Sequence, residues 1–112
     1  MKANVLGTEY EIILGNSNDY PHLEEVDGYC DTSIKKIVVK DFEGYKDEPS
    51  ALGDLEKYKI QVQRHELIHA FLYESGLSVC SNSEWATNEE MVDYFAIQFP
   101  KIVEVFKELK II

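Results

Sequence analysis

The spacing of the apolar residues changes once along this chain, near Asp54, and no other feature constrains the fold as strongly. Before that point, short apolar runs are separated by glycine and polar turn residues, which predicts β-strands. After it, apolar residues recur every three or four positions, which predicts helices. A β-rich half followed by a helical half predicts an α+β fold, with a small antiparallel sheet packed on helices.

The β-rich half predicts two hairpins. Residues 5–14 are expected to form the first, with a glycine-containing turn at residues 7–8. Residues 29–39 are expected to form the second, around residues 32–33. The polar segment 16–27 contains a proline and predicts a loop or a short helix. Both hairpins are therefore expected to contribute to one sheet.

The first helix has clear start and stop signals. Residues 41–53 combine charges with Pro49 and two glycines, which predicts a loop. Asp54 is expected to cap the helix that follows, and Gly76 is expected to end it. The sequence thus predicts one long helix across the middle of the chain.

Two further helices are expected near the C-terminus. Residues 87–90 have the form of a capping box, with Thr87 as the N-cap and Glu90 as the third helical residue. This helix is expected to reach about Gln98. Pro100 is expected to start or kink a final helix over residues 101–110, whose apolar residues share one face.

The length and charge of the chain exclude several classes of protein. The 112 residues suit a single domain, residues 1–112. The net charge of −10 argues against a nucleic-acid partner, because phosphate binding needs clustered cations. No apolar run approaches a transmembrane helix, and the N-terminus lacks a signal peptide. We therefore expect a cytoplasmic protein with no membrane contact, and Cys30 and Cys80 as free thiols.

The segment His65-Glu66-Leu67-Ile68-His69 carries the strongest chemical signal. On a helix the two histidines lie one turn apart on one face, so both imidazoles can bind one tetrahedral metal ion. Glu66 follows the first histidine directly, which suits a general base acting on water that the metal acidifies. The apolar neighbours predict a buried helix, where polar side chains need partners. A chance match on a solvated helix is the alternative interpretation.

The third metal ligand is expected on the next helix, because a catalytic zinc site usually has three protein ligands and one open position. The acids available there are Glu89, Glu90 and Asp93. If Glu90 closes the capping box, Glu89 is left as the ligand. Asp93 lies four residues later on the same face and would orient a ligand histidine through a hydrogen bond. We predict one Zn²⁺ per chain, bound by His65, His69 and Glu89, with Glu90 as the alternative.

These residues resemble a known pattern. His65-Glu66-x-x-His69 followed by Glu89-x-x-x-Asp93 is similar to the gluzincin motif of thermolysin-like metallopeptidases. Residues 89–96 also resemble the ligand helix of ImmA/IrrE-type peptidases. Residues 6–10 and 65–71 resemble small metallopeptidase-like proteins of phages and prophages of Gram-positive bacteria. The resemblance implies a minimal zincin-like domain with an active-site helix, a metal-ligand helix and a C-terminal helix.

The resemblance also implies where a substrate would lie. An edge strand beside the active-site helix would receive an extended peptide by β-augmentation, and residues 34–40 are expected to be that strand. Gluzincins often place a His or Tyr beyond the ligand helix to stabilise the oxyanion. This chain departs from the pattern, because Tyr94 is the only such residue there. Tyr73, Tyr29 and His22 stay open as substitutes.

Three functions are compatible with the sequence. The first is a zinc metalloendopeptidase, a hydrolase whose partner is a peptide or protein substrate. The second is a metal-stabilised regulatory or binding module of phage origin without peptidase activity. The third is a helical interaction protein with a chance motif, which predicts no metal. The sequence leaves the oligomeric state open.

Overall fold

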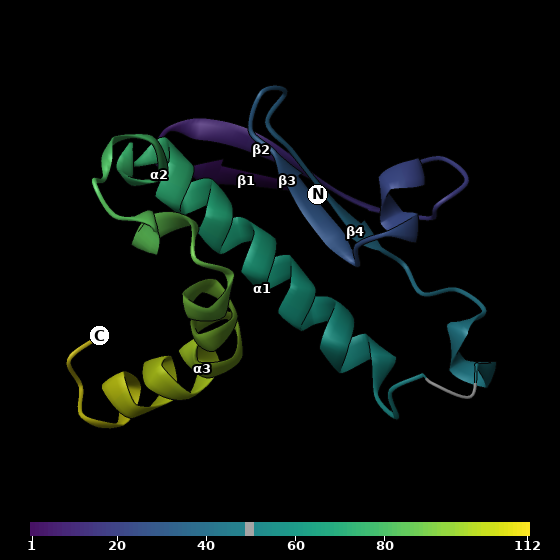
Figure 1. Cartoon of the computed structure of the whole chain (residues 1–112). Coiled ribbons are helices and arrows are strands. Elements are labelled where there is room, and N and C mark those ends of the chain that lie inside the picture. Colours follow the sequence, from purple (N-terminus) through teal and green to yellow (C-terminus); the bar gives the residue numbers. More distant parts are fainter. Residues whose placement is uncertain (49–50) are drawn as a thin grey trace.

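Two hairpins build a four-stranded sheet, and the long helix α1 lies across one of its faces (Figure 1). The computed structural model describes residues 1–48 and 51–112. The strands are β1 (Lys2–Val5), β2 (Thr8–Gly15), β3 (Gly28–Asp31) and β4 (Lys36–Lys40). The α-helices are α1 (Leu55–Glu74), α2 (Leu77–Cys80) and α3 (Glu89–Glu108). The α+β class is confirmed.

The sheet is mixed and not wholly antiparallel, which corrects one expectation. Each hairpin is antiparallel, but the strand order is β1-β2-β4-β3, and β2 runs parallel to β4 with Ile12 opposite Ile37. The composition of β4 explains its central position. Ile37, Val38 and Val39 are each at most 2% exposed, and a strand that is apolar on both faces belongs inside a sheet.

The edge strand beside α1 is therefore β3. The expectation that residues 34–40 form this edge is wrong, because β4 pairs with β2 on one side and with β3 on the other. Ile34 lies in the turn before β4 and is 59% exposed. Within the described residues, no strand pairs with the side of β3 that points away from β4.

Helix α1 begins and ends where the sequence predicts. The Asp54 carboxylate accepts a hydrogen bond from the Lys57 backbone N–H at 2.9 Å, which caps the first turn. Gly76 follows the last turn with a φ of +84°, a conformation that favours glycine. The buried face of α1 packs on the sheet through one cluster, whose fully or largely buried members are Val5, Tyr10, Ile12, Ile37, Val39, Val62 and Ala70.

Gly28, the first residue of β3, allows the sheet to approach α1 closely. A Cβ atom added at Gly28 would lie 2.6 Å from Cγ1 of Val62 and 3.4 Å from Cγ of Glu66. The first of these distances is well inside van der Waals contact. Glycine at this position therefore brings the edge strand next to the residue that the sequence predicts as a general base.

Helix α3 is one continuous helix, where the sequence predicts two. Pro100 lies inside it. Proline has no N–H to donate to the carbonyl of Ala96, one turn earlier, and that loss normally breaks a helix. Here the Arg64 side chain of α1 supplies a donor, since its Nε lies 2.6 Å from the Ala96 oxygen.

The start of α3 also differs from the capping-box prediction. Asn88, not Thr87, is the N-cap, and its side-chain oxygen accepts from the Met91 N–H at 2.9 Å. The Thr87 hydroxyl instead donates to the Glu84 carbonyl at 3.1 Å, within a 3-10 turn. Asn is as good an N-cap as Thr, so the helix starts one residue later than expected. Glu90 then has no capping role.

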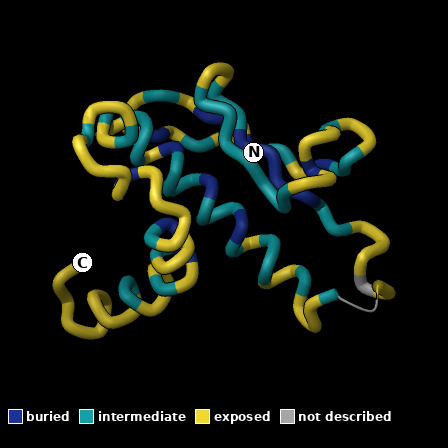
Figure 2. The backbone as a smooth tube through the Cα atoms, viewed as in Figure 1, coloured by how far each residue is buried: buried dark blue, intermediate teal, exposed yellow. Residues whose placement is uncertain are grey.

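The connecting segments are short helical turns. Residues 16–27 contain a 3-10 turn at Pro21–Glu24, as expected, and the loop before α1 contains another at Tyr45–Asp47. Pro49, expected in that loop, lies outside the described residues. The C-terminal half of α3 is mostly exposed (Figure 2). Among the described helices, none is long and apolar enough to span a bilayer.

Glu74, the last residue of α1, joins the helix to the sheet. Its carboxylate accepts hydrogen bonds from the Tyr10 hydroxyl at 2.8 Å and from the Lys35 Nζ at 2.7 Å. The Lys35 bond, followed by the Tyr10 bond, lowers the pKa of Glu74 below its ordinary value. The end of α1 is therefore held by an ion pair as well as by apolar packing.

The variant Gly28→Ala should lose about 1–3 kcal/mol of unfolding free energy, because the added methyl group overpacks the contact with Val62. Gly53→Ala is the control, since among the described residues, apart from its chain neighbours, no atom lies within 4 Å of a Cβ placed there. Urea unfolding measures both. Equal effects of the two substitutions would contradict the close approach at Gly28.

The variant Glu74→Gln should lower the Tm at neutral pH, because an amide cannot form the ion pair with Lys35. A carboxyl whose pKa is lower in the folded than in the unfolded state stabilises the folded protein at pH values above the unfolded pKa. That stability is lost as pH falls through the folded pKa. The Tm difference between wild type and variant should therefore be full near pH 7 and shrink below about pH 4. A Tm difference that persists unchanged into stronger acid would contradict a stabilising role of the Glu74 charge.

Candidate metal centre

His65 and His69 lie one turn apart on α1 and point to the same place. Their ring centroids are 4.8 Å apart, and their Nε2 atoms are separated by 3.1 Å. Both side chains are largely buried, with 13% and 20% of their surfaces exposed. The spacing of the motif on a helix thus produces the convergence that the sequence predicts.

Glu89, the first residue of α3, completes the group from the other helix. Its two carboxylate oxygens lie 2.8 Å from Nε2 of His65 and 3.0 Å from Nε2 of His69. One ligand atom from each of the three residues lies within 4.8 Å of the others. Ligands about 2.0–2.2 Å from a tetrahedral zinc ion are separated by roughly 3.3–3.6 Å, so the three side chains can hold such an ion after small adjustments.

The donor chemistry of this group fits a cation. Nε2 of His65 faces both Glu89 and Nε2 of His69, at 2.8 and 3.1 Å. A ring nitrogen carries one proton or one lone pair, so it cannot serve both neighbours at once. A cation between the three residues would accept a lone pair from each ring and one from the carboxylate, and would satisfy all of them.

Asp93 lies behind His65, one turn after Glu89 on the same face of α3. Its Oδ1 accepts a hydrogen bond from Nδ1 of His65 at 2.7 Å. A proton held on Nδ1 leaves the lone pair of Nε2 pointing at the centre of the group. Asp93 therefore has the geometry expected of a residue that orients a metal ligand.

Glu66 is the most deeply buried acid near this group. The residue is 7% exposed, and its Oε1 lies 3.9 Å from Nε2 of His65. Burial raises the pKa of Glu66 to about 7; His65 opposes the rise, and the charges of Glu89 and Asp93 add to it. A carboxyl with a pKa in this range can both accept and release a proton near neutral pH.

Two cavities meet at the candidate centre. The first, of about 330 Å³, lies between α1, α3 and the segment before β3, and its walls include Asp27, Tyr58 and Gln61. The second, of about 410 Å³, lies beside β3, with Tyr29 and Tyr73 in its walls. Residues common to both cavities are Val26, Gly28, Glu66 and Glu89. The group is therefore accessible from two sides.

The structure separates the two glutamates that the sequence left as alternatives. Glu90 lines a different hollow, together with Trp85, Met91 and Tyr94. The capping argument that favoured Glu89 is wrong, since Asn88 caps the helix. Glu89 is nevertheless the residue that meets the histidines, because it lies four residues from Asp93 on the face that packs against α1.

The residues considered as oxyanion donors are also separated. Tyr29 and Tyr73 line the second cavity, whereas Tyr94 lies in the hollow with Glu90. His22 lies with its ring against Tyr29, 5.1 Å between centroids, and lines neither cavity at the centre. Tyr29 and Tyr73 therefore remain as candidates.

Sequence reasoning did not identify Gly28 and Cys30 as part of this region. Both line the second cavity from β3. Burial raises the pKa of the Cys30 thiol to about 12, so it is a neutral group there. The only sequence feature that indicated a role for Gly28 is its place at the start of a predicted strand, where a glycine often allows another segment to approach closely.

Comparison of the chain with models of protein families, with curated proteins and with solved structures finds no match in any of the three.

Proposed function

We propose that this chain is a zinc-dependent metallopeptidase in which His65, His69 and Glu89 bind the metal and Glu66 is the general base. The observation that supports the proposal is the convergence of these three side chains from α1 and α3, with a buried carboxyl beside them. The gluzincin-like spacing of the same residues in the sequence also supports it. A cytoplasmic location and a phage or prophage origin are expectations of the same proposal.

The ion in this proposal supplies Lewis acidity, which polarises the scissile carbonyl and acidifies water. The protein residues do the rest. Glu66 takes a proton from the attacking water and delivers it to the leaving amine nitrogen. Asp93 keeps the proton of His65 on Nδ1, so that Nε2 remains a ligand.

The free edge of β3 is the surface on which an extended peptide would lie. Gly28, Tyr29 and Cys30 of this strand line the cavities at the centre. A peptide that pairs with the backbone of β3 would pass Glu66, because α1 approaches the strand at Gly28. The peptide would thus pair with β3 and not with residues 34–40, the segment expected from the sequence.

A second function, a metal-stabilised binding module without turnover, is favoured by one observation. Tyr94, the only Tyr beyond the start of the ligand helix, lies away from the centre in the hollow lined by Trp85 and Glu90. If neither Tyr29 nor Tyr73 donates to the oxyanion, the chain would bind a metal and a peptide without cleaving it. Turnover decides between the two functions.

The first test of the proposal concerns the metal ligands. Glu89→Gln should weaken zinc binding strongly, whereas Glu90→Gln, the adjacent acid with the same change in charge, should leave the Kd unchanged. Asp93→Asn should raise the Kd by about 10–100-fold, since it replaces the charged acceptor of His65 with a weaker, neutral one. Competition with a zinc-sensitive dye measures all three. Equal effects at positions 89 and 90 would contradict Glu89 as a ligand.

The second test concerns the base. Glu66→Gln should lower kcat for peptide hydrolysis by about 10²–10⁴-fold while zinc remains bound, because the amide cannot accept a proton. Cleavage of a denatured protein substrate and zinc content are measured on the same preparation. Full activity in this variant would remove Glu66 from its role. Zinc binding without any cleavage by the wild type would favour the binding module.

A further inference from the structure

Pro100 cannot donate the backbone hydrogen bond that the carbonyl one turn earlier in α3 would normally accept. The residue one turn earlier is Ala96, whose carbonyl would normally accept from the N–H at position 100. Ala96 is fully buried. A buried carbonyl without a donor is costly, so another group has to supply one.

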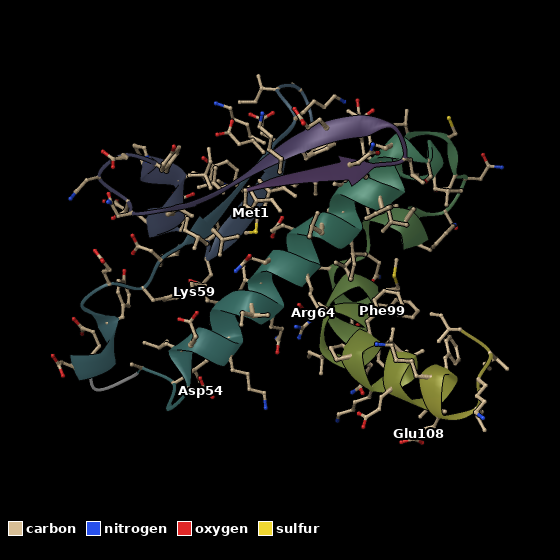
Figure 3. All side chains as sticks on the ribbon, turned by 180° about the vertical axis from the view of Figure 1, so that it is seen from behind. Met1, Asp54, Lys59, Arg64, Phe99 and Glu108 are labelled. Atoms are coloured by element: carbon tan, nitrogen blue, oxygen red, sulfur yellow. The ribbon has the colours of Figure 1, made fainter. Side chains whose placement is uncertain are left out.

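Arg64 is that group. Its Nε donates to the Ala96 carbonyl at 2.6 Å, from the position directly before His65. Figure 3 shows Arg64 on the side of α1 that faces α3. It is the only arginine in the chain, and among the described residues it forms no ion pair with a carboxylate, although 21 residues are acidic. Its guanidinium group donates instead to the backbone of α3.

Ala96, which accepts the bond from Arg64, lies on the same face of α3 as Glu89 and Asp93. Glu89, Asp93, Ala96 and Pro100 follow one another at steps of four, three and four residues, which is one face of α3. Among the described residues, the other hydrogen bonds and ion pairs between α1 and α3 all involve His65 or His69. This bond is therefore the one polar contact between the two helices, among the described residues, that does not involve the histidines of the candidate centre.

We propose that Arg64 is a positioning residue, which occupies the carbonyl left free by Pro100 and so holds α3 against α1 with Glu89 and Asp93 facing the histidines. Only two residues of α3, Val92 and Ala96, are buried. Apolar packing alone therefore constrains the helix weakly, and a directional bond two turns from Glu89 fixes its rotation. The metal-binding consequence rests on the proposed function, but the coupling between Arg64 and Pro100 does not.

The test is a double-mutant cycle with Arg64→Met and Pro100→Ala. Arg64→Met should raise the Kd for Co²⁺, followed by its visible absorption, by about tenfold or more, as the loss of a supporting contact does at metal sites. In the metal-free protein it should also speed amide exchange in the first turns of α3. Pro100→Ala restores an N–H that can donate to Ala96. In that background, Arg64→Met should change neither quantity.

Lys57→Met is the matched control, because it removes one positive charge from an exposed position on the same helix. It should leave the Kd and the exchange rates unchanged. If Arg64→Met has the same effect with or without Pro100, the free carbonyl is not the reason and the proposal is overturned. A lower Tm with unchanged Co²⁺ affinity and exchange would also overturn it. If the wild type binds no Co²⁺, the proposed function fails, and amide exchange alone decides whether Arg64 holds α3.

Discussion

The structure depends on how α1 accommodates charged side chains beside the face that packs on the sheet. One side of α1 is buried against the sheet, and Glu66 lies at this boundary with 7% of its surface exposed. Polar groups in such a place need partners. Glu89 and Asp93 of α3 are these partners for the histidines. The candidate site therefore forms only when α3 lies in this position against α1.

Much of this arrangement is readable from the sequence because it is local. Helical periodicity places His65 and His69 on one face, and Asp54 and Gly76 mark the ends of their helix. The mixed sheet was not predictable in the same way, since the place of a strand within a sheet is decided by what covers both of its faces. Glu89 meets the histidines although the capping argument that favoured it is wrong, because Asn88, which ranks above Thr as an N-cap, caps the helix.

The continuous α3 shows where local rules fail for a physical reason. Pro100 predicts a break, but α3 continues through it, and Arg64, distant in sequence, donates to the carbonyl that Pro100 cannot serve. No pattern within α3 contains that information. Likewise, the edge strand β3 can lie close to α1 at Gly28 because glycine leaves room for Val62. In both cases a residue that weakens its own element is compensated by a contact with α1.

We propose that a metal ion is held between α1 and α3. The most direct test is the metal content of protein purified without added metal or affinity-tag histidines, for the wild type and for His69→Ala. The account predicts about one zinc per wild-type chain, as in three-ligand catalytic sites, and its loss in the variant. A wild-type protein that holds no metal after zinc addition and dialysis would contradict the account.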